Sequence, residues 1–212
     1  MRPLAELDPT EVRVLGVLME KEQTTPEYYP MTLNAIRMAC NQKTNRDPVV
    51  NLDEDQVEQA LETLDQDLFV ARAGGARADH WKHRADIVWK LNPRTQAVLT
   101  LLLLRGPQTV GEIRARSERM HPFASVEEVE TALQELASSS EPLAHDLGRR
   151  PGQKETRWAA AFSSEAAGEA PPSVQTGSRS ALEERIARLE ERVERIELEL
   201  EARKREPRER EE

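Results

Sequence analysis

The chain contains the same short helical pattern twice, and this duplication limits its possible folds more than any single residue does. Residues 57–64 read Val-Glu-Gln-Ala-Leu-Glu-Thr-Leu, and residues 129–136 read Val-Glu-Thr-Ala-Leu-Gln-Glu-Leu, with the shared apolar residues on one helical face. Residues 32–37 recur in similar form at 109–114. A repeated unit of roughly 70 to 85 residues is large enough to close a core of its own. We therefore expect two similar domains with separate cores.

Each copy of the repeat is predicted to form three helices followed by a two-stranded hairpin. In the first copy we expect helices at residues 8–21, 32–41 and 53–67, and strands at 68–72 and 86–91. In the second copy we expect helices at residues 93–105, 109–119 and 125–138, and strands at 143–147 and 155–162. Capping boxes are predicted at Asp8 with Glu11 and at Ser125 with Glu128. This order of elements is that of a winged helix, a variant of the helix-turn-helix.

The segment between the first and third predicted helices resembles a known family. Residues 25–35 read Thr-Pro-Glu-Tyr-Tyr-Pro-Met-Thr-Leu-Asn-Ala, and residues 39–50 read Ala-Cys-Asn-Gln-Lys-Thr-Asn-Arg-Asp-Pro-Val-Val. In order and spacing they resemble the YceH-like family of bacterial proteins. The resemblance covers residues 7–162 and implies a tandem winged-helix fold, in agreement with the duplication. It supplies no catalytic residues and no function.

The expected fold is mainly α-helical with small β-hairpins, arranged as tandem winged-helix domains followed by a C-terminal coiled-coil helix. A stretch rich in Ser, Ala, Gly, Glu and Pro separates the repeats from the last helix, as is typical of a flexible linker. The predicted parts are winged-helix domain 1 at residues 1–92, winged-helix domain 2 at 93–162, the linker at 163–179, the coiled-coil helix at 180–206 and a frayed tail at 207–212.

The last helix carries the heptad pattern of a coiled coil. Its apolar residues, spaced alternately by four and three, are Leu182, Ile186, Leu189, Val193, Ile196 and Leu200. In a parallel pair, Arg185 would face Glu190 across the interface and Arg192 would face Glu197. We therefore expect a parallel homodimer. A solitary charged helix is the alternative, because the pattern covers only about three heptads.

The distribution of acidic and basic residues does not fit the usual way in which a winged helix binds DNA. By fold analogy the third helix enters the major groove of DNA, yet residues 51–71 contain seven carboxylates and no Lys or Arg. Basic side chains lie instead in the loop after the second helix and in the two hairpins. These candidate nucleic-acid-binding residues are Lys43, Arg46, Arg72, Arg77, Lys82, His83, Arg84, Arg149, Arg150, Lys154 and Arg157. Ordinary solvated loops are the alternative interpretation.

Two functions follow from these charges. In the first, a dimeric tandem winged-helix protein associates with DNA or acts as a regulator, and its basic wings contact phosphates. In the second, acidic winged-helix surfaces bind partner proteins and the chain is an interaction adaptor, which suits its net charge of −9. We favour DNA association because helix-turn-helix folds so often serve it, which is an argument from analogy.

The sequence carries no motif of an enzyme. It lacks a phosphate-cradling Gly-rich loop, a nucleophile elbow and a paired-cysteine zinc pattern, so we expect no catalytic residues and no cofactor. His80 and His83 lie close to Asp79 and Asp86, but their odd spacing on a strand points the two rings to opposite faces, and we expect no metal site. The single cysteine, Cys40, falls on the apolar side of its helix and is expected to be buried.

We expect a cytoplasmic protein without a membrane partner. The longest apolar run, residues 97–104, includes a threonine and is far shorter than the roughly 20 residues that cross a bilayer. The first residues lack the apolar stretch of a secretory signal, and one cysteine cannot form an internal disulfide.

Overall fold

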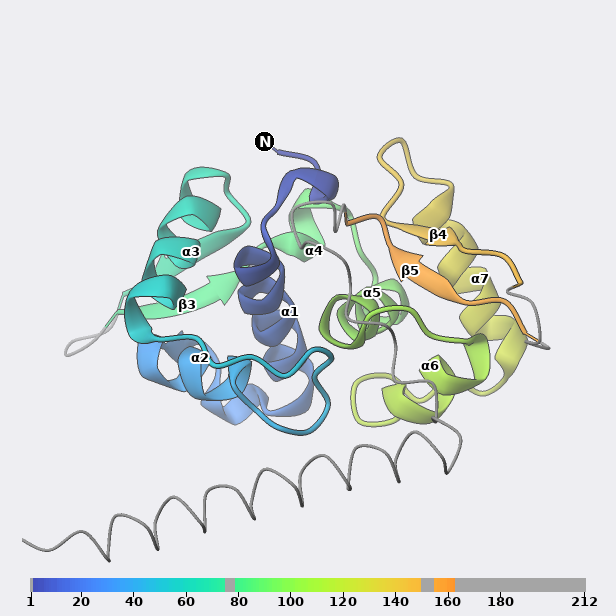
Figure 1. The fold of residues 1–212 in the computed structure, drawn as a ribbon, viewed down its shortest axis with the longest axis horizontal. Helices are drawn as coiled ribbons and strands as arrows, with labels where there is room; N and C mark the ends of the chain where they lie inside the picture. Colours follow the sequence, from blue (N-terminus) through green and yellow to red (C-terminus); the bar gives the residue numbers. More distant parts are fainter. Residues whose placement is uncertain (1, 75–78, 150–154, 163–212) are drawn as a thin grey trace, which may run out of the picture. The chain divides into compact units, whose positions relative to one another are not determined.

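The computed structural model describes residues 2–74, 79–149 and 155–162, which belong to one compact unit at residues 1–167. This part of the chain is mainly α-helical with two small antiparallel sheets (Figure 1). Its helices are α1 (Pro9–Thr24), α2 (Leu33–Cys40), α3 (Glu54–Gln66), α4 (Ala85–Val88), α5 (Pro93–Arg105), α6 (Val110–Ser117) and α7 (Val126–Ala137), with 3-10 turns at Leu4–Glu6 and Pro26–Tyr28. The predicted linker, coiled-coil helix and tail lie outside the described residues.

The two copies attach the start of their second helix to the hairpin in the same way. The strands are β1 (Met31–Thr32), β2 (Val70–Ala73), β3 (His80–His83), β4 (Ala144–Asp146) and β5 (Trp158–Ala160). The first sheet has the order β1-β3-β2, and Met31 pairs with Trp81. In the second copy β4 pairs with β5, and Gln108 forms an isolated bridge with Trp158. Met31 and Gln108 both precede the N-cap residue of a second helix, so the duplication includes this pairing.

The six helices predicted between residues 8 and 138 are confirmed, and local capping explains where they begin. The Asp8 carboxylate accepts hydrogen bonds from the N–H groups of the first turn of α1, while the Glu11 carboxylate accepts one from the N–H of Asp8. At α7 the capping box is only half formed. Ser125 accepts a hydrogen bond from the N–H of Glu128, but the Glu128 carboxylate accepts from the N–H of Ala124.

The strand predicted at residues 86–91 is wrong. Its place in the first hairpin is taken by β3, whose alternating pattern buries Trp81 and His83. Part of the predicted strand belongs instead to the short helix α4, which starts at the fully buried Ala85. Ala85 and Trp89 are one helical turn apart. A short apolar run cannot distinguish these two outcomes by itself, because a strand and a single helical turn both bury part of it.

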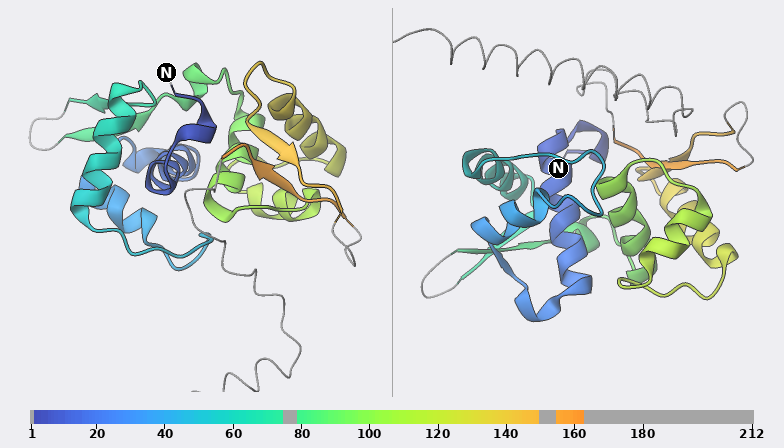
Figure 2. Two further views of the ribbon diagram at one scale, coloured as in Figure 1. Left: turned by 45° about the horizontal axis from the view of Figure 1, so that its top comes forward. Right: turned by 60° about the horizontal axis from the view of Figure 1, so that its bottom comes forward.

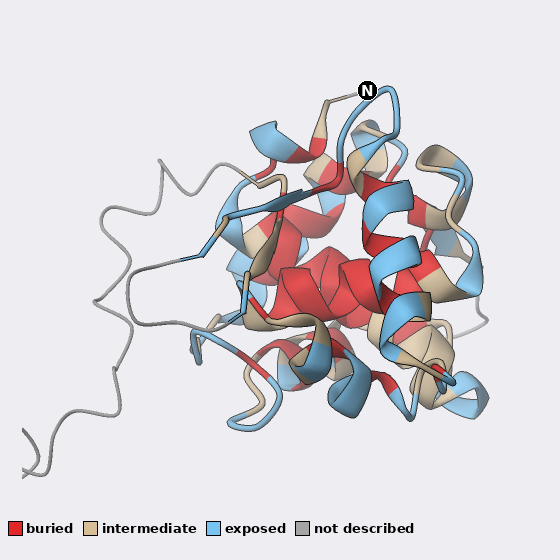
Figure 3. Cartoon of the chain, turned by 90° about the vertical axis from the view of Figure 1, so that its right-hand side faces the viewer, coloured by how far each residue is buried: buried red, intermediate tan, exposed pale blue. Residues whose placement is uncertain are grey.

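The buried side chains of the two copies form one continuous core, so the expectation of separate cores is wrong. α1 and α5 pack against each other in its middle (Figure 1), and Figure 3 shows the buried residues gathered in the interior. Every residue from Glu11 to Met19 and from Thr95 to Leu104 is buried. A helix that is apolar and buried all round needs neighbours on every side. Each of these two helices therefore packs against the helices of its own copy and against the other copy. We call the contact between α1 and α5 the seam. The domain boundary between residues 92 and 93 stays a prediction.

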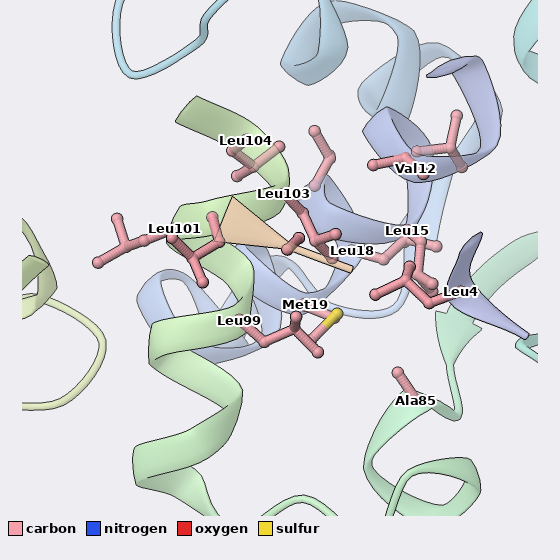
Figure 4. Packing of buried hydrophobic residues seen from close by; sticks show 14 of the residues in the cluster. Leu4, Val12, Leu15, Leu18, Met19, Ala85, Leu99, Leu101, Leu103 and Leu104 are labelled. Atoms are coloured by element: carbon pink, nitrogen blue, oxygen red, sulfur yellow. The ribbon is translucent and has the colours of Figure 1, made fainter. Parts of the chain in front are cut away.

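Gly16 allows the two helices of the seam to approach closely. A Cβ atom at this position would lie 3.0 Å from Cδ2 of Leu104 and 3.3 Å from Cβ of Leu103. Figure 4 shows these two leucines of α5 within the cluster that also contains Leu15 and Leu18 of α1. A glycine in the middle of a helix weakens that helix, so its presence here is explained by the packing.

Replacing Gly16 with leucine should lower the free energy of unfolding by about 1–3 kcal/mol, because the new side chain forces α1 and α5 apart. Urea unfolding followed by circular dichroism measures this. Gly111→Ala is the matched control, since its added Cβ meets only Thr109 Oγ1, at 4.0 Å. Alanine favours a helix over glycine, so the control should be neutral or stabilising by up to about 1 kcal/mol. Equal effects of the two changes would contradict close packing at the seam.

Candidate nucleic-acid interface

Arg46, a candidate from the loop after α2, lies inside the protein. Its side chain is 0% exposed, and its Nη2 and Nη1 atoms lie 2.7 Å and 3.0 Å from the two carboxylate oxygens of Glu20 on α1. Its Nε also donates to the carbonyl oxygen of Ala39, and Nη2 donates to Oε1 of Gln42. In this arrangement the guanidinium holds the loop against α1 and α2, and its donors are used within the protein.

The ion pair determines the protonation of its carboxylate. Burial by itself would raise the pKa of Glu20, but the hydrogen bonds and the charge of Arg46 outweigh burial, and the pKa lies below its ordinary value. Arg13 extends the same contact, because its Nη2 donates to the carbonyl oxygen of Pro48 at 2.6 Å. Burial and then the charge of Arg46 lower the pKa of Arg13. Residues 42–50 are thus fastened to α1 by two buried arginines.

His83, another candidate, also faces the interior. Its side chain is 0% exposed, and Nε2 lies 2.7 Å from Oε2 of Glu22 on α1. The same oxygen accepts a hydrogen bond of 3.0 Å from Nε2 of Gln96 on α5. The hydrogen bond with His83 lowers the pKa of Glu22. The backbone N–H of His83 donates to the hydroxyl of Tyr29, whose pKa is raised by burial. This polar group joins α1, β3 and α5 at the seam.

The remaining candidates differ in solvent exposure and in whether a carboxylate lies nearby. Lys43, Lys82 and Arg149 are exposed, and Arg84 is half-buried. Arg72 lies 4.9 Å from the centroid of the Trp81 ring and 3.1 Å from the carboxylate of Asp79. Arg157 donates to the carbonyl oxygen of Pro107 and lies 3.2 Å from Glu112. Candidates Arg77, Arg150 and Lys154 lie outside the described residues.

The third helix of each copy carries acidic side chains on its outer face. On α3, the exposed residues Glu58 and Glu62 follow the acidic first turn, and on α7 Glu130 and Glu135 are exposed. α3 packs on α1 and α7 packs on α5, so these two helices flank the seam (Figure 2). Carboxylates in the first turn stabilise the positive end of a helix, but those farther along have no such role. The outer faces of α3 and α7 would repel phosphate.

Sequence reasoning missed the arginines that end α5 and follow on α6. Nη2 of Arg105 donates to the side-chain oxygen of Asn45, and the N–H of Asp47 donates to the carbonyl oxygen of Leu104. Nη1 of Arg116 donates to Oε1 of Gln108 at 2.8 Å. The contact between Arg105 and Asn45 spans 60 residues of sequence, and no local pattern indicates it.

Known proteins place the chain in a family. Residues 7–153 match the model of a family described as "Protein of unknown function, DUF480". The chain belongs to this family. The expected resemblance to a bacterial family without an assigned function is therefore confirmed.

Several bacterial relatives, each named UPF0502 protein, cover most of the chain. The relative from Geotalea daltonii is 48% identical over 188 residues, or 86% of each protein. The relative from Shewanella piezotolerans is 44% identical over 201 residues, or 87% of this chain and 91% of the relative. The relative from Pelobacter propionicus is 52% identical over 154 residues, or 72% of this chain and 70% of the relative.

Within residues 2–74, 79–149 and 155–162, no group of three or more His, Cys, Asp or Glu side chains is placed to hold a metal ion. None of the helices in these ranges combines the length and the apolar character needed to cross a membrane. Cys40 is buried, as expected, and burial raises the pKa of its thiol to about 12.

Replacing Arg46 with glutamine should lower the free energy of unfolding by about 3 kcal/mol, because Glu20 is left buried without its partner. The pH dependence should change as well. Because the pKa of Glu20 is lower in the folded state, its stabilisation is complete above the unfolded value of 4.5 and is lost as the pH falls through the folded value. Urea unfolding between neutral and acidic pH should show a shallower acid loss in the variant. An unchanged stability would mean that Arg46 is free to bind a ligand.

Proposed function

We propose that the chain is a non-enzymatic, cytoplasmic DNA-associated protein with two winged-helix units, dimerised through its C-terminal helix. The observation that supports this most is the repeated topology. In each copy three helices precede an antiparallel hairpin, and a residue just before the second helix pairs with the last strand of that hairpin. The same order of elements is expected of a helix-turn-helix with an attached wing, and such folds commonly bind DNA.

The charges favour the hairpins over the third helices as the DNA contact. Lys82 on β3 and Arg149 after β4 are exposed, and neither makes an ion pair with a carboxylate of the described residues. A phosphate contact of this kind carries no sequence information, so binding should depend strongly on salt and weakly on sequence. The acidic faces of α3 and α7 would then point away from the duplex.

A protein-interaction adaptor is the second candidate function. The exposed carboxylates of α3 and α7 favour it, because they offer two similar acidic faces, one on each copy. A basic partner would fit such faces by charge complementarity. Capture of partners from lysate by the full-length protein, compared with gel shifts on random duplex DNA, separates the two functions.

Replacing Lys82 and Arg149 together with glutamine should weaken binding to random duplex DNA and lower the slope of log affinity against log salt by about two, one for each lost phosphate contact. Fluorescence anisotropy at several salt concentrations measures both quantities. Arg94→Gln is the control, since it removes a cation that is already paired with Glu135 at the start of α5. Affinity unchanged by the double replacement would count against the hairpin contact.

Replacing Ile186 and Val193 together with lysine should convert a dimer into a monomer, because both residues occupy core positions of the predicted coiled coil. Sedimentation velocity of the full-length chain measures the state. Glu191→Lys at an outer position is the control and should leave the dimer intact. A dimer should also bind DNA more tightly than the monomeric variant, because two linked sites act together. A wild-type chain that sediments as a monomer would refute this part of the proposal.

A further inference from the structure

Three arginines from three different elements meet at one end of the seam. They are Arg46 in the loop after α2, Arg105 at the end of α5 and Arg116 on α6, and we call them the seam arginines. Asn45 connects two of them, because its carbonyl oxygen accepts from Nη1 of Arg46 at 2.8 Å and its side-chain oxygen accepts from Arg105. The loop therefore lies beside the end of α5, as Figure 1 also shows.

A buried glutamine ties the third arginine to the same place. Gln108 accepts from Nη1 of Arg116, and its own Nε2 donates to the carbonyl oxygens of Leu101 and Gly106. Gly106 directly follows Arg105 in the chain. Arg116 is thus held next to the end of α5 by a side chain that is 1% exposed. The contacts of Asn45 with Arg105 and of Asp47 with Leu104 join the two copies, so the cluster exists only when the seam is formed.

Positive charge exceeds negative charge at this cluster. Arg46 is neutralised by Glu20, whereas Glu112 lies 3.6 Å from Arg116 and also serves Arg157 at 3.2 Å. Among the residues that the structure describes, Arg105 has no carboxylate within ion-pair distance, and its bonded partner is the neutral side chain of Asn45. Desolvation and then the like charge of Arg116 lower the pKa of Arg105, and Glu20 offsets this only in part.

The cluster is open to a ligand. The Arg116 side chain is 36% exposed and Arg105 is half-buried. The exposed Lys43 lies on the loop after α2, which also carries Arg46. A partly desolvated guanidinium that lacks an anionic partner gains more from a phosphate than one that is already paired or fully hydrated. Arg105 is such a group, and Arg116, whose partner Glu112 is shared with Arg157, lies on the adjoining element. Together they offer two positive charges to the phosphates of one strand.

We propose that Arg105 and Arg116 bind backbone phosphate of duplex DNA at this end of the seam, with Arg46 fixing the loop that positions Arg105. This contact rests on the proposed DNA association and adds a site that the hairpins do not contain. The site combines the loop of the first copy with α5 and α6 of the second copy. Binding there would therefore orient both copies together on the duplex. The acidic third helices need not enter the groove for such binding.

The test compares binding of the full-length chain to random-sequence duplex DNA for the wild type, Arg105→Gln, Arg116→Gln and the double variant. Fluorescence anisotropy at several salt concentrations is the measurement. We expect each single variant to weaken binding several-fold, and the double variant to weaken it at least about tenfold and to lower the salt slope by about two. Arg105→Lys, which keeps the charge, should retain most of the affinity.

The control Arg94→Gln removes one positive charge from the same helix, at a side chain that is 35% exposed, and should change the affinity less than the seam variants do. Circular dichroism and urea unfolding establish that each variant is folded. If the wild type binds and the double variant binds equally well, the seam site is wrong while the DNA proposal stands. If Arg94→Gln weakens binding as much as Arg105→Gln does, the loss of affinity reflects the net charge of the protein and not a specific site, and the seam site is also wrong. If the wild type itself fails to bind at low salt, both proposals fail.

Discussion

The packing of α1 against α5 is the contact on which the rest of the described structure depends. The two helices are buried at every residue from Glu11 to Met19 and from Thr95 to Leu104, and Gly16 lets them approach so closely that a methyl group would touch Leu104. Neither copy could cover its own central helix alone, because each of the other helices faces only one side of it. The duplicated unit has therefore become half of one hydrophobic core, which favours a rigid pair over two independently moving modules.

Polar contacts at the edges of this packing, several of them partly exposed to solvent, help to orient the two copies. Glu22 joins His83 of the first copy to Gln96 of the second, and the loop after α2 reaches the end of α5 through Asn45 and Asp47. Hydrogen bonds of this kind add only modest net stability, since the same groups would bond to water in the unfolded chain. Their contribution here is geometric, because a different packing of α5 on α1 would leave these groups without partners.

This rigidity bears on function. Two copies that are fixed to each other present one surface instead of two, and their acidic third helices, α3 and α7, flank the seam. The positively charged side chains that could contact DNA lie on the hairpins and among the seam arginines. A duplex held by such groups would be recognised through its phosphates, which gives affinity and salt dependence with little sequence preference. The proposed adaptor function would instead use the exposed carboxylates of α3 and α7.

The amino-acid sequence by itself determined the local structure and the duplication. Helix starts such as Asp8 and Asp53, and the apolar faces of α3 and α7, depend on contacts within a few residues, so their patterns are visible along the chain. The tertiary structure alone decided the features that join distant residues. It turned residues 85–88 into a helix, merged two expected cores into one and withdrew Arg46 and His83 into the interior. It also brought Arg105 to Asn45 across 60 residues, because the burial and pairing of a charge depend on what packs against it, and that is known only when the chain has folded.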